Sequence, residues 1–229
     1  MSISTNSFNE IVAELSGKYL ADEVLQTSFK IICRYLLKNP DRLSWRGKDK
    51  PDIQTESGLN TLGTKYFLSY RKSDFPADPG TVPDQIVSIV MQVAYGYSEK
   101  DCEYIKSTHQ QSMCAENTVG ALLERYLDSV LRNHNWHWCC GSFVKAIDFI
   151  KEDENGNWFE LQIKNRDNSE NSSSSAIRNN TNIQKWFRTF SKTGETNWGN
   201  LPQLMQGYDL SEDGFRKFVQ DYLLSCKNT

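Results

Sequence analysis

Three side chains between residues 148 and 164 have the chemistry needed to hydrolyse a phosphodiester bond: Asp148, Gln162 and Lys164. The Asp148 carboxylate and the Gln162 amide oxygen are ligands that hard divalent cations accept. Such a cation polarises a phosphate and lowers the pKa of a bound water. The Lys164 ammonium group can orient or deprotonate the attacking water and offset charge that develops on phosphorus. In-line attack would leave a 5′-phosphate and a 3′-hydroxyl.

A β-hairpin must bring these residues together, and its loop determines the register. The strand-like segments 143–150 and 157–164 flank Glu154-Asn155-Gly156. This tripeptide predicts a three-residue loop in which the glycine adopts the left-handed conformation as a bulge. We therefore expect Asp153 to lie opposite Asn157.

The same register predicts that Asp148 lies opposite Gln162. A two-residue loop would instead pair Asp148 with Ile163 and turn the polar residues to the wrong face. The alternation of polar and apolar residues supports the first register, because Glu160, Gln162 and Lys164 then share one side of the strand. Taken alone, the same residues could also form a solvated surface hairpin.

Asp148 followed by Gln162-Ile163-Lys164 on a hairpin resembles the PD-(D/E)XK nuclease superfamily, in the variant where Gln replaces the acidic residue. That family usually supplies a further acidic residue from a preceding helix, in a pattern like G-x-x-x-E-x-Y. Residues 120–126 match this pattern, so the resemblance implies that Glu124 takes that position. The predicted catalytic residues are Asp148, Gln162, Lys164 and Glu124, and the predicted metal ligands for Mg²⁺ are Asp148, Gln162 and Ile163.

The chain departs from the superfamily pattern at two positions. Ile147 stands where proline usually precedes the aspartate, and Gln162 makes the site one negative charge poorer. Glu160 could compensate, although about 6.5–7 Å along the strand is a long reach. Glu116, two helical turns before Glu124, is a second candidate for the helical carboxylate.

The polar segment that follows the hairpin has the composition of a DNA-reading loop. Residues 164–192 contain six cations and two anions, a net charge of +4. A flexible Ser/Asn linker is the alternative. Arg, Asn and Ser are donors suited to base edges and phosphates. The predicted DNA-binding residues are Arg166, Asn168, Ser172, Arg178, Lys185 and Arg188, with Arg166 and Arg178 as the main contacts and Lys185 and Arg188 as phosphate ligands. Trp186 and Phe187 are expected in the core.

The run NRDNSENSSSS…IR…T.I.KWFR, continuing through residues 193–198, is similar to type II restriction endonucleases, most of all to the SinI-type group, which recognises GGWCC. The similarity covers roughly residues 115–210. It implies a homodimer that binds double-stranded DNA and cuts both strands of a short palindrome with Mg²⁺. It also implies a DNA methyltransferase that protects the host DNA.

The remaining elements are predicted from apolar periodicity and from turn residues. Residues 116–132 give the strongest helical signal, and Ser211 is expected to cap an amphipathic final helix. We further expect helix over 7–38, 84–94 and 99–110, loops over 39–84 with a short strand near 66–70, and a short helix over 183–190.

These elements predict an α/β fold, a restriction-endonuclease-like core with a central mixed β-sheet flanked by helices. We expect residues 1–229 to form a single catalytic domain. Residues 115–210 are expected to hold the nuclease core and the DNA-reading segment. Residues 1–98 form a helical and loop part that serves dimerisation or DNA contact.

The composition excludes several classes of protein. Hydrophobic residues make up 38% of the chain, enough for a buried core, and no apolar run is long enough for a membrane span. A net charge of −3 is not typical of a protein that coats nucleic acid. The start lacks a secretory signal, and the six cysteines are read as reduced thiols of a cytoplasmic protein, mostly core. His134 and His137 do not predict a zinc site with Cys139 and Cys140, because alternate side chains of one strand point apart.

Two alternative functions remain open at this point. The first is a repair or junction nuclease with the same core, which would cut branched DNA and leave linear duplex alone. The second is a non-catalytic DNA-binding regulator, which would bind DNA without cutting it. Incubation of the protein with phage DNA and Mg²⁺ separates them from restriction, which would give discrete bands that are lost in Lys164→Ala.

Overall fold

The computed structural model describes residues 4–168 and 181–227 as an α/β fold built around a mixed sheet with strand order β1-β2-β3-β4. The strands are β1 (His137–Trp138), β2 (Phe149–Glu152), β3 (Trp158–Arg166) and β4 (Gln184–Thr189). The α-helices are α1 (Thr5–Lys18), α2 (Glu23–Lys38), α3 (Glu56–Arg71), α4 (Gln85–Tyr95), α5 (Glu99–Leu131) and α7 (Glu212–Lys227). Short 3₁₀ turns are formed by Pro40–Arg42, Arg132–His134, Trp198–Asn200 and Gln203–Met205.

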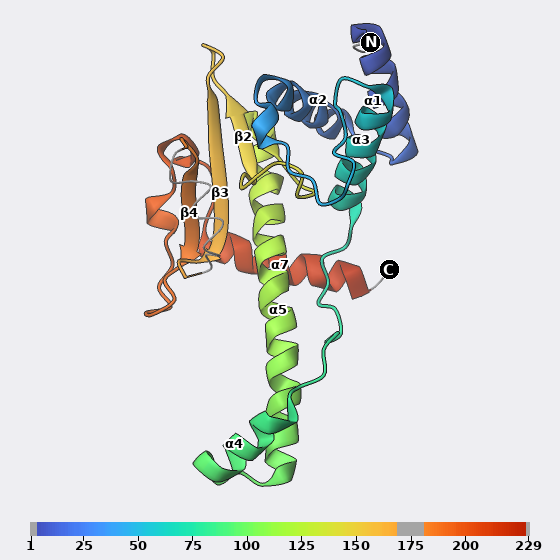
Figure 1. The fold of residues 1–229 in the computed structure, drawn as a ribbon. Coiled ribbons are helices and arrows are strands. Elements are labelled where there is room, and N and C mark those ends of the chain that lie inside the picture. Colours follow the sequence, from blue (N-terminus) through green and yellow to red (C-terminus); the bar gives the residue numbers. More distant parts are fainter. Residues whose placement is uncertain (1–3, 169–180, 228–229) are drawn as a thin grey trace.

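The helix α5 runs the length of the molecule and organises the rest (Figure 1). The strands and α1 to α3 gather around its C-terminal end, α7 crosses it, and α4 lies against its N-terminal end. The expected helices over 99–110 and 116–132 are therefore one helix of 33 residues. Ser98 and Asp101 form a capping box at its start.

The predicted loop and register of the β2–β3 hairpin are confirmed. The Asp153 N–H donates to the Asn157 carbonyl at 2.9 Å, and Gly156 has a φ of +80°. Antiparallel pairing then continues from Glu152–Trp158 to Phe149–Leu161, as the three-residue loop requires. Local turn chemistry thus sets which face of β3 carries Gln162 and Lys164.

The strand expected over 143–150 is shorter than predicted, because β2 begins only at Phe149. Ala146 has a φ of +58°, which breaks the extended conformation. The preceding backbone bonds to a different partner: Ser44 N–H donates to the Phe143 carbonyl and Lys145 N–H to the Arg42 carbonyl, both at 2.8 Å. Asp148 therefore lies at the end of the ladder rather than inside it.

The short helix expected over 183–190 is wrong, since Gln184–Thr189 forms the strand β4. This strand is parallel to β3, with Ile163 beside Trp186 and Lys164 beside Phe187. Trp186 is 2% exposed, as expected for a core residue, while Phe187 is only partly buried. A short apolar run can form either structure, and the neighbouring strand supplies the backbone partners here.

The N-terminal part also differs from the prediction. The helix expected over 7–38 is divided into α1 and α2 at Leu20, which has a φ of +50°. The loops and short strand expected over 39–84 include the helix α3 instead. Gly63 lies in that helix where it passes α1, and a Cβ there would lie only 2.5 Å from Leu15 Cδ1. A side chain at this position would displace Leu15, so the glycine that weakens the helical signal favours close packing of α1 against α3.

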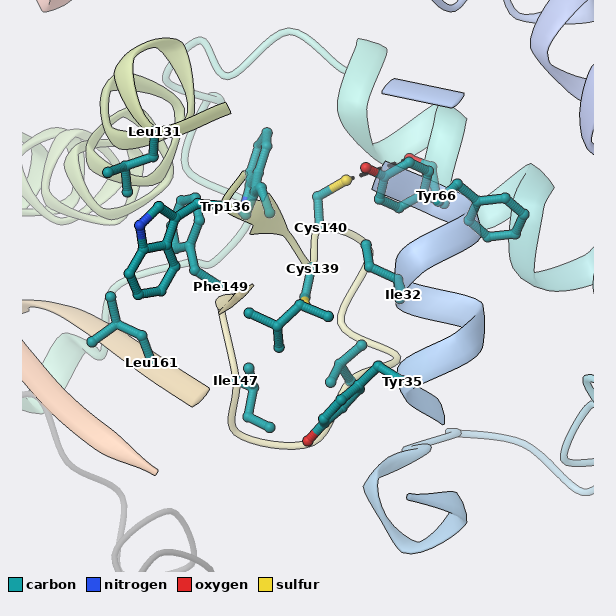
Figure 2. Close-up of a cluster of buried hydrophobic side chains, with 14 of the residues drawn as sticks. Ile32, Tyr35, Tyr66, Leu131, Trp136, Cys139, Cys140, Ile147, Phe149 and Leu161 are labelled. Atoms are coloured by element: carbon teal, nitrogen blue, oxygen red, sulfur yellow. Dashed lines mark hydrogen bonds between the residues drawn. The ribbon is translucent and has the colours of Figure 1, made fainter. Parts of the chain in front are cut away.

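One continuous apolar core joins the N-terminal helices to the sheet, α5 and α7. Figure 2 shows Cys139 and Cys140 inside it, between Tyr66 and Phe149. The Cys140 thiol approaches the Tyr66 carbonyl oxygen at 3.5 Å. The cysteines of the described chain are free and mostly buried, as the sequence predicts. None of the described helices combines the length and apolar character needed to cross a bilayer.

Candidate active site

All four predicted catalytic side chains line one pocket of about 750 Å³: Glu124, Asp148, Gln162 and Lys164. Glu124 comes from α5, Asp148 from the residue before β2, and the other two from one face of β3. The loop of the hairpin and the packing of α5 against β3 thus bring together residues that are up to 40 positions apart in the sequence. Asp148 and Lys164 face the same cavity.

Asp148 is held by three hydrogen bonds at the end of β2. Its backbone N–H donates to the Leu161 carbonyl at 2.8 Å, and its carbonyl accepts from Cys139 N–H at 2.8 Å. Its Oδ2 accepts from Ile163 N–H at 2.7 Å, so the side chain takes the place of a backbone partner. Asp148 is therefore fixed beside β3, although it does not pair with Gln162 as predicted.

Desolvation by burial raises the pKa of Asp148 to about 6, against the opposing effects of the Ile163 N–H and the Lys164 charge. Burial, followed by the negative charge of Asp148, raises the pKa of Glu124 to about 8. Trp138 Nε1 donates to Glu124 Oε2 at 2.8 Å and orients it. Two desolvated carboxyl groups that repel each other are electrostatically suited to a cation, whose binding would release their protons.

Gln162 is 3% exposed, and its Oε1 has no hydrogen-bond partner within the described part of the chain. A buried acceptor without a partner costs about 1–3 kcal/mol. The Ile163 N–H points toward Asp148, and in a strand the N–H and C=O of one residue point to the same side. Gln162 lines this pocket, and Ile163 lines the adjoining pocket, which shares Glu124 and Lys164 with it. The two residues can thus offer two oxygen atoms to a ligand where the pockets meet, and this donor set fits a hard divalent cation.

The two other acidic candidates do not join the cluster. Glu160 is buried against α2 and its following turn, where Arg42 Nη2 donates to it at 2.7 Å and Tyr35 also donates. Its charge is therefore neutralised elsewhere, and it does not replace the one missing at Gln162. Glu116 is exposed and lines an adjoining pocket with Lys164 and Arg166. Among the described residues, no group of three or more His, Cys, Asp or Glu is placed to hold a metal ion.

The residues predicted to contact DNA differ in their exposure and in their distance from the pocket. Arg166 and Asn168 are exposed just beyond the catalytic face of β3. Lys185 Nζ lies 3.5 Å from the Asp167 carbonyl oxygen. Ser172 and Arg178 lie outside the described residues.

Arg188 has a structural environment that argues against the expected phosphate contact. Its Nη1 donates to both carboxylate oxygens of Glu212, at 2.7 and 2.9 Å, and its Nε donates to Asn165 Oδ1 at 3.0 Å. Only 14% of the Arg188 side chain and 17% of the Glu212 side chain are exposed. The pair joins β4 to the start of α7.

Three cations that sequence reasoning missed stand on the walls of the catalytic pocket: Arg46, Lys72 and Lys145. All three are exposed. Arg46 precedes α3, Lys72 follows it, and Lys145 lies before β2. No local pattern could reveal them, because they are single residues in loops that only the fold assembles.

Comparisons with known proteins point to a single family. A model of the SinI restriction endonuclease family matches residues 10–225. The chain is 44% identical over 209 residues to the type II restriction enzyme Eco47I of Escherichia coli, covering 87% of this chain and 88% of that protein. It is 41% identical over 227 residues to the type II restriction enzyme SinI of Salmonella infantis, covering 94% and 96%.

Proposed function

Because the chain belongs to the SinI restriction endonuclease family and is a type II restriction endonuclease, we propose that the pocket of Glu124, Asp148, Gln162 and Lys164 cuts one strand of double-stranded DNA. The observation that carries this proposal is the convergence of two carboxyl groups, an unpartnered amide oxygen and an ammonium group in one cavity. The alternatives of a junction nuclease and a non-catalytic regulator receive no support from the named relatives.

We propose Mg²⁺ as the divalent cation, held by the Asp148 carboxylate, Gln162 Oε1 and the Ile163 carbonyl. The fit rests on the unpartnered Oε1 and on the raised pKa of the carboxyl groups, which a cation would lower. When bound, the cation supplies positive charge that stabilises the negative charge developing on the scissile phosphate.

The chain's own residues have distinct roles in this proposal. Lys164 orients the attacking water and donates hydrogen bonds to a phosphate oxygen. Glu124 is a second carboxyl group that can hold or release a proton near neutral pH, since its pKa is about 8. The hydrogen bond from Trp138 keeps Glu124 directed at the pocket. Cleavage leaves a 5′-phosphate.

The exposed cations on both sides of the pocket support a polyanionic substrate. Arg166 and Asn168 lie at the end of β3, and Arg46, Lys72 and Lys145 lie on the other walls. A local basic rim reconciles DNA binding with a net charge of −3.

The recognition sequence that we propose is GGWCC, the site of the SinI-type group that residues 115–210 resemble. A palindrome is cut symmetrically by two copies of the chain, one for each strand. A methyltransferase that modifies the same site would protect the host DNA in the cytoplasm.

The test is cleavage of phage DNA with Mg²⁺, followed by sequencing of the fragment ends. Lys164→Ala should abolish the discrete bands while keeping the melting temperature. Lys217→Ala, which removes an exposed lysine of α7 that does not line the pocket, should cut as the unsubstituted protein does. Equal cutting by Lys164→Ala and the unsubstituted protein would refute the assignment of this pocket. Ends that do not map to GGWCC would refute the proposed site alone.

A further inference from the structure

Residues 82–113, which contain α4 and the first part of α5, form an arm that projects from the body of the protein (Figure 1). Between Lys106 and Leu122, none of the α5 residues is buried, and within the described chain this stretch makes only peripheral contacts, such as those of Gln110 with Thr81 and of Val119 with the edge of the core. An isolated helix of this length is marginal in water. The arm therefore has the character of an element that is completed by another surface.

The arm exposes a continuous apolar stripe. Ile86, Ile89, Val90 and Val93 follow the three- and four-residue spacing of one helical face, and they are 61%, 55%, 53% and 82% exposed. Residues 85–97 contain no charged side chain. Further exposed apolar side chains of the arm are Val82, Val87, Tyr95, Tyr97, Tyr104 and Met113.

The stripe is not needed to hold the arm together. The helix α4 contacts α5 through a different face, where Met91 is 9% exposed and Cys102 is fully buried. The Cys102 thiol approaches the Ser88 carbonyl oxygen at 3.8 Å, and Ser88 Oγ approaches Glu103 Oε1 at 3.5 Å. The outward face of α4 is thus left for a second molecule.

Charge excludes DNA as the occupant of this surface. Residues 84–113 contain four acidic and two basic side chains, so the arm repels phosphate. An anionic lipid surface is disfavoured for the same reason, because helices that lie on membranes carry basic flanks. An uncharged stripe with acidic flanks fits a protein surface.

We propose that the stripe docks on the same stripe of a second copy of this chain, so that the two arms form a helical dimer interface. This inference rests on the proposed function, because cutting two strands with one pocket per chain requires two copies. A two-fold interface buries the same patch on both partners, so an uncharged apolar stripe is complementary to itself. The ten exposed apolar residues of the arm offer on the order of 1,000 Å², against the about 800 Å² per partner of a standard interface.

The test is sedimentation velocity of the full chain at micromolar concentration, without DNA or Mg²⁺. We expect the unsubstituted protein to sediment as a dimer. Ile89→Asp/Val93→Asp should sediment as a monomer with an unchanged far-ultraviolet circular dichroism spectrum, because both side chains are already exposed in one chain. The dimer dissociation constant should rise by at least about 100-fold, since four carboxylates would be buried in each dimer.

The matched control is Leu224→Asp, which places the same charge on an exposed apolar position of α7 and should remain a dimer. Ile89→Ala/Val93→Ala removes apolar surface without adding charge and should raise the dissociation constant by about tenfold or more. A monomeric unsubstituted protein, or a dimer that survives in Ile89→Asp/Val93→Asp, would overturn the inference. The inference would also be overturned if Leu224→Asp dissociates the dimer.

The measurement is independent of cleavage. Lys164→Ala should sediment as a dimer while failing to cut. If the unsubstituted protein dimerises through the arm but cuts no DNA, the proposed function fails and the interface stands.

Discussion

Replacing Gln162 by methionine should stabilise the metal-free protein while abolishing cleavage. Gln162 is 3% exposed and its Oε1 is an acceptor without a partner among the described residues, which costs about 1–3 kcal/mol. Methionine has a similar length and no polar atom that needs a hydrogen bond. After allowance for imperfect packing, the free energy of unfolding should rise by about 1–2 kcal/mol. For a chain of this size that corresponds to a melting temperature higher by about 2–8 °C.

The assay is thermal unfolding in EDTA and then across a Mg²⁺ titration. A cation that binds the folded state alone stabilises the unsubstituted protein by about 2.7 kcal/mol at one hundred times its dissociation constant. Gln162→Met should lose most of this increase together with cleavage. Gln220→Met, which changes an exposed glutamine on α7, should behave as the unsubstituted protein does. If Gln162→Met is less stable in EDTA, or keeps the full response to Mg²⁺, the carboxamide is not positioned for a cation.

Further predictions follow from the charges of the site and its surroundings. Because the pKa of Glu124 is raised to about 8 and that of Asp148 to about 6, the folded metal-free protein binds more protons than the unfolded chain between about pH 6.5 and pH 8, above the range in which the lowered pKa of His137 acts in the opposite direction. Its free energy of unfolding in EDTA, measured with urea, should therefore fall as the pH rises through that range, and Glu124→Gln should flatten the fall; a rising curve would contradict the raised pKa values. Arg188→Ala should lower the free energy of unfolding by about 1–2 kcal/mol, because the partly buried Glu212 carboxylate loses its two-oxygen partner and keeps only the contacts of Trp198 and Arg216. If Arg188→Ala has normal stability but binds DNA more weakly, Arg188 contacts DNA as the sequence predicts. Arg46→Ala and Lys145→Ala should each reduce the slope of log affinity against log salt by about 1 in a non-cutting background, as measured by fluorescence anisotropy; an unchanged slope would remove them from the DNA contacts.

The parts of the site that could be predicted are those that local geometry determines. The two-residue period of a strand puts Gln162 and Lys164 on one face of β3, and the loop that Glu154-Asn155-Gly156 predicts decides how β3 is aligned with β2. The position of Asp148 was predicted less well. Its carboxylate accepts the Ile163 N–H instead of Asp148 pairing with Gln162, and the backbone two residues earlier, at Ala146, has a positive φ that the sequence does not reveal.

Features that depend on distant partners could not be predicted from local patterns. Residues 184–189 form a strand because β3 lies beside them, although the same apolar run also suits a helix. Gly63 weakens the signal of α3 for a reason that only the neighbouring α1 reveals. Arg188 has the charge of a phosphate ligand, but Glu212 from another element neutralises it. In each case a tertiary contact overrides the local preference.

Because α5 is one unbroken helix, its length fixes the distance between the catalytic pocket and the docking arm in the proposed dimer. One helix carries Glu124 near one end and the docking arm at the other, so the number of residues between them sets how far apart the two cuts fall. Each residue added to α5 between the arm and Glu124 would increase this distance by about 1.5 Å and turn the Glu124 carboxylate by about 100° relative to the two-fold axis. Insertions or deletions of about seven or about eleven residues, close to two or three full turns, would restore its direction. The stagger between the two strand breaks should therefore change among relatives in helical steps rather than gradually.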